Sequence, residues 1–128
     1  MAKTHITQKN QLTEDTKLFR GIEYSDFMEN WFKNRGINEN GFSSTSFNKD
    51  IVFKHVNKNL NNDGWIIEID APKNTQGGYL EQYSAYAEEL EFLLPRNSTF
   101  EILNIDFENR EIKTKIKNIY NIKNKIKN

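Results

Sequence analysis

The chain contains no cysteine, and this absence excludes disulfides, thiolate nucleophiles and cysteine-based zinc sites. A fold without cysteine can work in an oxidising or a reducing compartment alike. No apolar run approaches the roughly 20 residues that a transmembrane helix needs. The first residues, from Met1 to Gln8, also lack the apolar core of a secretory signal peptide. The sequence therefore predicts a soluble chain with no recognisable export signal.

An excess of charge of one sign is also lacking, because 18 basic residues balance 18 acidic ones. Global charge therefore gives no reason to expect nucleic-acid or membrane binding. Locally, no acidic residue follows Lys113, and residues 121–128 form a basic tail. Two interpretations of this region stay open: a solvated edge strand with a frayed terminus, or a surface for a phosphate-rich partner. Its lysines are Lys113, Lys115, Lys117, Lys123, Lys125 and Lys127.

Metal-ligating patterns are scarce as well. The two histidines, His5 and His55, are far apart in the chain and have no ligand companions, so the sequence predicts no metal site. It contains neither a glycine-lysine phosphate loop nor a serine–histidine triad. His55 falls on the inner face of a predicted helix, beside Ile51, Val52 and Val56, and is expected to be packed rather than catalytic.

The length of 128 residues predicts a single domain, 1–128, with a real core. Residues 1–16 are polar and weakly patterned, and we expect an irregular or partly helical lead-in. The remaining pattern of two short helices and many strands predicts an α+β domain, with helices to one side of an antiparallel or mixed sheet. Strands are expected at 17–22, 41–47, 65–70, 91–94, 100–107 and 111–120, with a loop at 73–78.

The two helices are predicted from the spacing of apolar residues. One runs behind a possible cap at Ser25 and stops near Gly36, and the other runs from about Lys49 to Lys58. The first carries an aromatic stripe, which is typical of core packing. The residues of this stripe are Tyr24, Phe27, Met28, Trp31 and Phe32.

What the sequence does have is a cluster of carboxylates against an apolar run, at 86–96. Glu89 and Glu91 are two positions apart, so on extended backbone both side chains point to the same side of a sheet. Like charges side by side repel each other, and a fold tolerates them mainly where a cation is to be met. A carboxylate in the position of Glu91 can bind a ribose hydroxyl and stabilise the cation that forms when a glycosidic bond opens. The alternative is a Glu at a strand end in a surface ion pair.

Two earlier segments carry side chains that suit the same chemistry. Arg20 is next to Gly21 at the end of a predicted strand, where a guanidinium could clamp a pyrophosphate and a glycine lets backbone approach a ligand. Ser44 and Ser46 alternate with Thr45, so the two serines share one face of a strand. The alternatives are a surface arginine and a strand filled with neutral hydroxyl residues.

In this order, Arg20, Ser44-Thr45-Ser46 and Glu89-Leu90-Glu91 resemble the Arg, Ser-Thr-Ser and Glu-x-Glu motifs of the bacterial ADP-ribosyltransferase exoenzymes. That family includes the catalytic components of actin-modifying binary toxins and the Rho-modifying exoenzymes. The resemblance covers about residues 17–120. Flanking residues of this sequence that match are Phe19, Gly41-Phe42, Tyr86 and Leu93-Leu94-Pro95-Arg96.

The resemblance implies transfer of ADP-ribose from NAD to an arginine of a target protein, with release of nicotinamide and without a metal. By this likeness Arg20 binds NAD phosphate or ribose, and the backbone of Gly21 holds the nicotinamide amide. Ser44 orients Glu91, which stabilises the oxocarbenium ion, and the Ser44-Thr45-Ser46 strand lines the nicotinamide pocket.

Two further residues are assigned to the acceptor by the same likeness. Tyr86 and Glu89 read the protein substrate, and an acid at 89 favours arginine because asparagine-modifying members carry Gln there. A carboxylate also suits this task chemically, because it accepts two parallel hydrogen bonds from a guanidinium. Phe53 or Lys54 is expected to supply a contact to NAD after the serine strand.

The family likeness also implies a two-sheet core with flanking short helices, and a secreted toxin that acts on an actin-like or other arginine-bearing protein. One departure is that only about sixteen residues precede the Arg20 strand, where the family has a helical segment. We therefore expect either a minimal version of the domain or a fragment whose missing N-terminal lobe comes from elsewhere, and the partners expected besides the target protein are that lobe or a delivery component. The alternatives are an inactive or partial domain of the same fold, an NAD glycohydrolase, and a small β-rich module that binds nucleic acid through the lysine tail.

Overall fold

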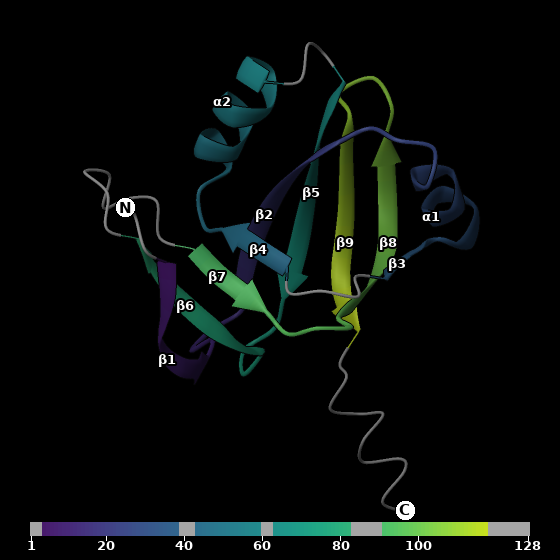
Figure 1. Cartoon of the computed structure of the whole chain (residues 1–128). Coiled ribbons are helices and arrows are strands. Elements are labelled where there is room, and N and C mark those ends of the chain that lie inside the picture. Colours follow the sequence, from purple (N-terminus) through teal and green to yellow (C-terminus); the bar gives the residue numbers. More distant parts are fainter. Residues whose placement is uncertain (1–3, 39–42, 60–62, 83–90, 118–128) are drawn as a thin grey trace, which may run out of the picture.

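A computed structural model describes residues 4–38, 43–59, 63–82 and 91–117 of the chain (Figure 1). These residues form nine strands and two helices, which is the predicted α+β class. The strands are β1 (Thr4–Gln11), β2 (Thr16–Glu23), β3 (Gly36–Asn38), β4 (Ser43–Ser46), β5 (Gly64–Ala71), β6 (Gln76–Gln82), β7 (Glu91–Leu94), β8 (Thr99–Asp106) and β9 (Glu111–Lys117), and the helices are α1 (Met28–Asn34) and α2 (Lys49–Asn59).

The strands follow the order β1-β6-β7-β4-β2-β5-β9-β8-β3. β5 and β9 run parallel and the other paired strands run antiparallel, so the predicted mixed sheet is confirmed. Among the described residues, which leave out 39–42 just before β4, one residue pair, Phe19 with Ser46, is in register between β2 and β4. The order therefore has two parts, which we call the first half-sheet (β1, β6, β7, β4) and the second half-sheet (β2, β5, β9, β8, β3). The pairing of β2 with β4 still joins all nine strands, so the two-sheet core that the family likeness implied is present here as two halves of one sheet.

β5 shows how its sequence builds a core on both faces of the second half-sheet. Its odd-numbered residues, such as Ile67 and Ile69, belong to the main apolar cluster, and Ile66 packs on the opposite face with Phe19 and two valines of α2. Alternation of side chains along a strand produces this division. Met28 of α1 belongs to the main cluster and the valines of α2 to the other, so the prediction that both helices lie to one side of the sheet is wrong. Because α2 contacts β2, β4 and β5, it covers the end of the sheet where β2 finishes (Figure 1).

Beyond α2, the same face of β5 is polar. Lys17 on β2 pairs with Glu68 at 3.3 Å and with Asp70 at 3.6 Å. The hydrogen bond to Glu68 and the charges of both acids raise the pKa of Lys17. These cross-strand pairs lie further along β5 than its contact with Val52 and Val56 of α2.

The N-terminal segment differs from expectation. Residues 4–11 form β1, which pairs antiparallel with β6, so the prediction of an irregular or partly helical lead-in over 1–16 is wrong. The predicted loop at 73–78 is also shorter, because β6 begins at Gln76. Buried Leu12 lies at the connection, where its backbone exchanges hydrogen bonds with Asn74 and Thr75. Backbone pairing with β6, rather than an apolar pattern of its own, makes this segment a strand.

The first helix is shorter than predicted, and its ends are built differently. It starts at Met28, whose backbone N–H donates to the backbone oxygen of Ser25, while the Ser25 hydroxyl is buried without a hydrogen-bond partner among the described residues. The predicted side-chain cap at Ser25 is therefore wrong. The helix ends at Arg35 in the left-handed conformation, and Gly36 already belongs to β3.

The aromatic stripe of α1 only partly enters the core. Met28 is fully buried, and Trp31 and Phe32 pack against the core cluster. Tyr24 and Phe27, however, are exposed. The second helix and the strands predicted at 17–22, 65–70 and 91–94 are confirmed. In the part of the chain that the structure describes, no helix is long and apolar enough to cross a membrane.

Candidate functional site

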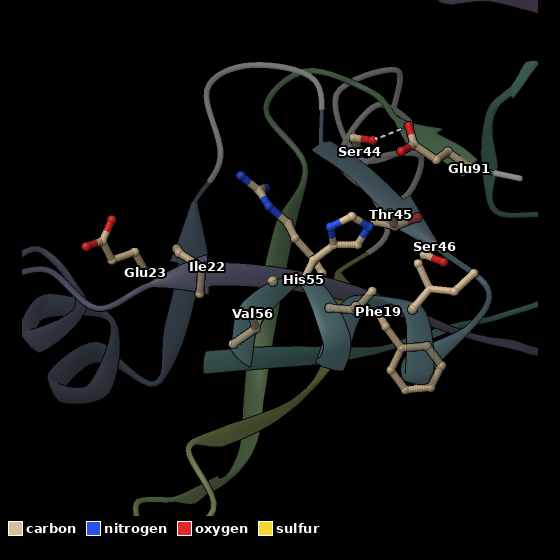
Figure 2. Close-up of a pocket in the computed structure, with 13 residues that line it drawn as sticks. Phe19, Ile22, Glu23, Ser44, Thr45, Ser46, His55, Val56 and Glu91 are labelled. Atoms are coloured by element: carbon tan, nitrogen blue, oxygen red, sulfur yellow. Dashed lines mark hydrogen bonds between the residues drawn. The ribbon is translucent and has the colours of Figure 1, made fainter. Parts of the chain in front are cut away.

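A cavity of about 500 Å³ lies where β2 ends and the two half-sheets meet (Figure 2). Its wall is built from four elements. β2 contributes residues 19–23, β4 contributes residues 44–46, and β7 contributes Glu91. The fourth wall is α2, through Ile51, Val52, His55 and Val56. The structure therefore brings Arg20, the serine strand and Glu91 to one space, although they are far apart in the sequence.

Glu91 is held at the start of β7 by a hydrogen bond from the neighbouring strand. The Ser44 hydroxyl donates to Glu91 Oε2 at 2.7 Å (Figure 2). β4 and β7 are antiparallel with Ser46 opposite Glu91, so Ser44 is its diagonal neighbour on the same face. A hydroxyl that donates to one carboxylate oxygen fixes the carboxylate plane and leaves the other oxygen available to a ligand.

Thr45 and Ser46 have contacts within the protein. The Thr45 hydroxyl is buried and donates to the backbone oxygen of Phe92 at 2.7 Å, which ties β4 to β7. Ser46 Oγ accepts the backbone N–H of Asn48 at 3.0 Å, and the Asn48 side chain in turn accepts the N–H of Asp50 at 2.9 Å. These two bonds fix the turn that leads from β4 into α2. The serine strand therefore positions both the carboxylate and the helix.

Gly21 has a packing reason for being a glycine. A Cβ atom built there would lie 2.6 Å from Val56 Cγ2 and 3.3 Å from Val52 Cγ1. Its backbone conformation is not left-handed, so space rather than backbone freedom is what Gly21 supplies. The missing side chain lets α2 approach β2 closely.

The residues assigned to the acceptor, Tyr86 and Glu89, lie outside the described residues. Glu91 is the first described residue after that segment, so the structure contains the nucleotide side of the predicted site. Among the residues that the structure describes, no group of three or more His, Cys, Asp or Glu side chains could hold a metal ion.

One polar residue of the cavity wall, His55, was not predicted from the sequence. His55 is exposed and lines it, so the expectation that this histidine is packed in the protein interior is wrong. Phe53 is 52% exposed and Lys54 is exposed, and neither lines the cavity. The signal that could have indicated this is the apolar stripe of α2, which is wider than the contact of the helix with β2. Val52 and Val56 fill the contact with β2, which leaves His55 at the edge that faces the opening.

Comparisons with known proteins agree with this geometry. The family model "ADP-ribosyltransferase exoenzyme" matches residues 4–126. The chain is 34% identical over 103 residues to the NAD(+)–arginine ADP-ribosyltransferase EFV of Enterococcus faecalis, covering 77% of this chain and 20% of that protein. It is 31% identical over 111 residues to the mono-ADP-ribosyltransferase C3 of a Clostridium botulinum D phage, covering 73% of this chain and 43% of that protein. The chain thus spans a fifth of one curated relative and less than half of the other.

Solved structures share the fold at lower identity. C3larvin, an ADP-ribosyltransferase toxin of Paenibacillus larvae, superposes with a TM-score of 0.58 at 20% identity, covering 84% of this chain and 64% of that one. Vis toxin, an ADP-ribosyltransferase of Vibrio splendidus, gives 0.62 at 18% identity, covering 88% and 53%. Because the family model spans nearly the whole sequence, this chain belongs to the ADP-ribosyltransferase exoenzyme family.

Proposed function

We propose that this chain is the catalytic domain of a mono-ADP-ribosyltransferase that transfers ADP-ribose from NAD to an arginine of a target protein. The observation that supports this most directly is the carboxylate of Glu91, held by Ser44 beside a cavity that Arg20 also lines. Such a site offers a fixed anion for a developing cation and a guanidinium for a pyrophosphate. NAD carries a pyrophosphate, and its ribose becomes a cation when nicotinamide leaves.

In the proposed reaction the bond between ribose C1′ and the nicotinamide nitrogen breaks, and its electron pair leaves with nicotinamide. The sugar becomes a cation, which Glu91 stabilises most strongly in the transition state. A guanidinium nitrogen of the acceptor then bonds to C1′ and releases a proton to solvent. Ser44 keeps the carboxylate aimed throughout, so no reorganisation is needed as charge develops.

Two observations favour arginine as the acceptor. Glu89, two positions before Glu91, suits a guanidinium chemically, and the relative EFV is named for transfer to arginine. The partner is accordingly a protein with an accessible arginine, actin-like by the family likeness. Solved neighbours named as toxins favour a secreted effector that acts on another cell, with or without a delivery component.

The experiment supplies radiolabelled NAD to the protein with purified actin, with a cell lysate, or with a free guanidino compound as a minimal acceptor. We expect label on a protein and on the guanidino compound, and matching nicotinamide release. Label on asparagine-bearing peptides alone would refute the arginine acceptor. Nicotinamide release without transfer to any acceptor would reassign the chain as an NAD glycohydrolase, and absence of both would leave the inactive-domain interpretation.

Replacing Ser44 with Ala should lower the kcat of nicotinamide release about tenfold, while the KM for NAD changes little. The reason is that the hydroxyl orients Glu91 rather than holding the nucleotide, and a lost positioning bond acts mainly on the transition state. Steady-state kinetics over a range of NAD concentrations would measure the two constants. A large rise in KM with unchanged kcat would contradict the assigned role.

Thr45 allows a contrasting test on the adjacent position. Thr45→Val keeps the side-chain shape but removes the buried bond to the Phe92 carbonyl, so we expect a loss of about 1 kcal/mol in the free energy of unfolding. Urea unfolding followed by fluorescence would measure it. An unchanged midpoint and slope would show that this bond does not tie β4 to β7 energetically.

A further inference from the structure

One polar side chain on α2 has no assigned role. Of the four α2 residues that line the cavity, three are apolar, and His55 alone can donate or accept hydrogen bonds from its side chain. His55 is exposed, and in Figure 2 its ring points away from α2 into the cavity. An exposed imidazole on the wall of a ligand cavity is available to a ligand.

The packing of α2 holds His55 in this place. Val52 and Val56 are buried against Phe19 and Ile66, and the missing side chain at Gly21 lets the helix sit directly on β2. The position of the helix start is fixed by the hydrogen bonds at Ser46 and Asn48. His55 is therefore presented by a helix that packs on β2 and is joined to β4 by a hydrogen-bonded turn.

The charges around His55 indicate which part of a dinucleotide it can bind. From β2 the cavity is lined by Arg20 and Glu23, and from β7 by Glu91. On its own helix the neighbouring charges are Asp50 and Lys54, both exposed. In NAD the nicotinamide ring is cationic and adenine is neutral, so only the pyrophosphate attracts an imidazolium. The carboxylate of Glu91 is occupied by Ser44 and, in the proposed reaction, by the ribose.

We propose that His55 binds the pyrophosphate of NAD as an imidazolium, as a second cation in the cavity that Arg20 also lines, so that dinucleotide affinity falls as the pH rises. The inference rests on the proposed function, because NAD is the ligand. Its sign follows from the protonated form being the binding form. The pyrophosphate keeps its charge at neutral and mildly acidic pH, so a loss of affinity on raising the pH would report the loss of the imidazolium.

Calorimetric titration with NAD and with ADP-ribose, at pH values of about 5.5 and 8.0, tests the proposal. We expect both ligands to bind about fivefold more weakly at the higher pH, as for an exposed charge pair. The variant His55→Gln should show nearly the same affinity at both pH values, and its KM should rise more than its kcat falls. His5→Gln removes the other histidine of the chain and serves as the matched control, which should keep the pH dependence. Thermal melting of each variant checks that the fold is intact.

The outcomes separate the role of His55 from the proposed function. If NAD binds and is cleaved, but His55→Gln keeps the pH dependence of the native protein, the role of His55 is refuted and the proposed function stands. The role of His55 is refuted in the same way if the pH dependence disappears in His5→Gln instead. If neither NAD nor ADP-ribose binds the native protein at either pH, the proposed function fails and the role of His55 fails with it.

Discussion

Glu91→Gln should slow the release of nicotinamide from NAD by about 100- to 1,000-fold, the range found when one preorganised charge-stabilising group is removed. Gln keeps the size of the side chain and can still accept a hydrogen bond from Ser44, so the protein should fold normally. It lacks the negative charge that the sugar cation requires. The KM for NAD should change much less than the kcat, because the ground-state ribose is not cationic.

The control for this variant is Glu101→Gln on β8. Glu101 is also a half-buried strand glutamate, but it pairs with Lys115 at 3.7 Å and does not line the cavity. Nicotinamide release measured by chromatography should be unaffected by this change. Persistence of near-native release or of protein labelling in Glu91→Gln would show that the catalytic assignment is wrong, whatever the control does.

Gly77→Ala should destabilise the protein by about 3 kcal/mol, towards the upper end of the cost of overpacking a core. A Cβ atom at this position of β6 would lie 2.5 Å from Phe92 Cε2 and 2.6 Å from the backbone oxygen of Leu93. Phe92 is completely buried and packs edge-on against Tyr79 and Phe47. The added methyl group would therefore have to displace β7, the strand that begins with Glu91.

Gly36→Ala is the matched control, because a Cβ atom there meets its nearest neighbour, the Phe100 oxygen, at an ordinary 3.5 Å. Both glycines lie in strands with backbone that is not left-handed. Chemical unfolding of both variants should show a large loss for Gly77→Ala and little change for Gly36→Ala. Equal stability of the two would show that β7 can shift at no cost, and the rigid placement of Glu91 would then have to be abandoned.

The sequence predicted those parts of the site that depend on residue chemistry in a fixed order. Arg20, Ser44 and Glu91 each have a charge or hydroxyl suited to one part of a dinucleotide, and the structure brings them to one cavity. The strands that carry them were predictable because Leu18, Ile67 and Phe92 belong to short apolar runs. The roles of these residues, and of Tyr86 and Glu89 outside the described residues, remain predictions.

The features that could not be predicted depend on contacts between distant segments. β1 is polar and becomes a strand by backbone pairing with β6, a partner that its own pattern does not indicate. Ser25 is a residue type that often caps helices, but at the start of α1 its backbone oxygen, and not its hydroxyl, accepts the N–H of Met28. His55 lies at one edge of the apolar stripe of α2, and this stripe is wider than the contact of the helix with β2. Only the position of α2 on the sheet shows that this edge faces the cavity.

The sparse joint between the half-sheets has a consequence for turnover. Glu91 and Ser44 belong to the first half-sheet and Arg20 to the second, and in the part of the chain that the structure describes Phe19 with Ser46 is the one pair in register between them. A dinucleotide that contacts Glu91 and Arg20 at the same time would connect the two half-sheets, which share little backbone pairing at that joint. Cleavage removes only nicotinamide, while the ribose and pyrophosphate of the remaining ADP-ribose still reach both half-sheets, so this link would last until transfer to the acceptor carries the group away.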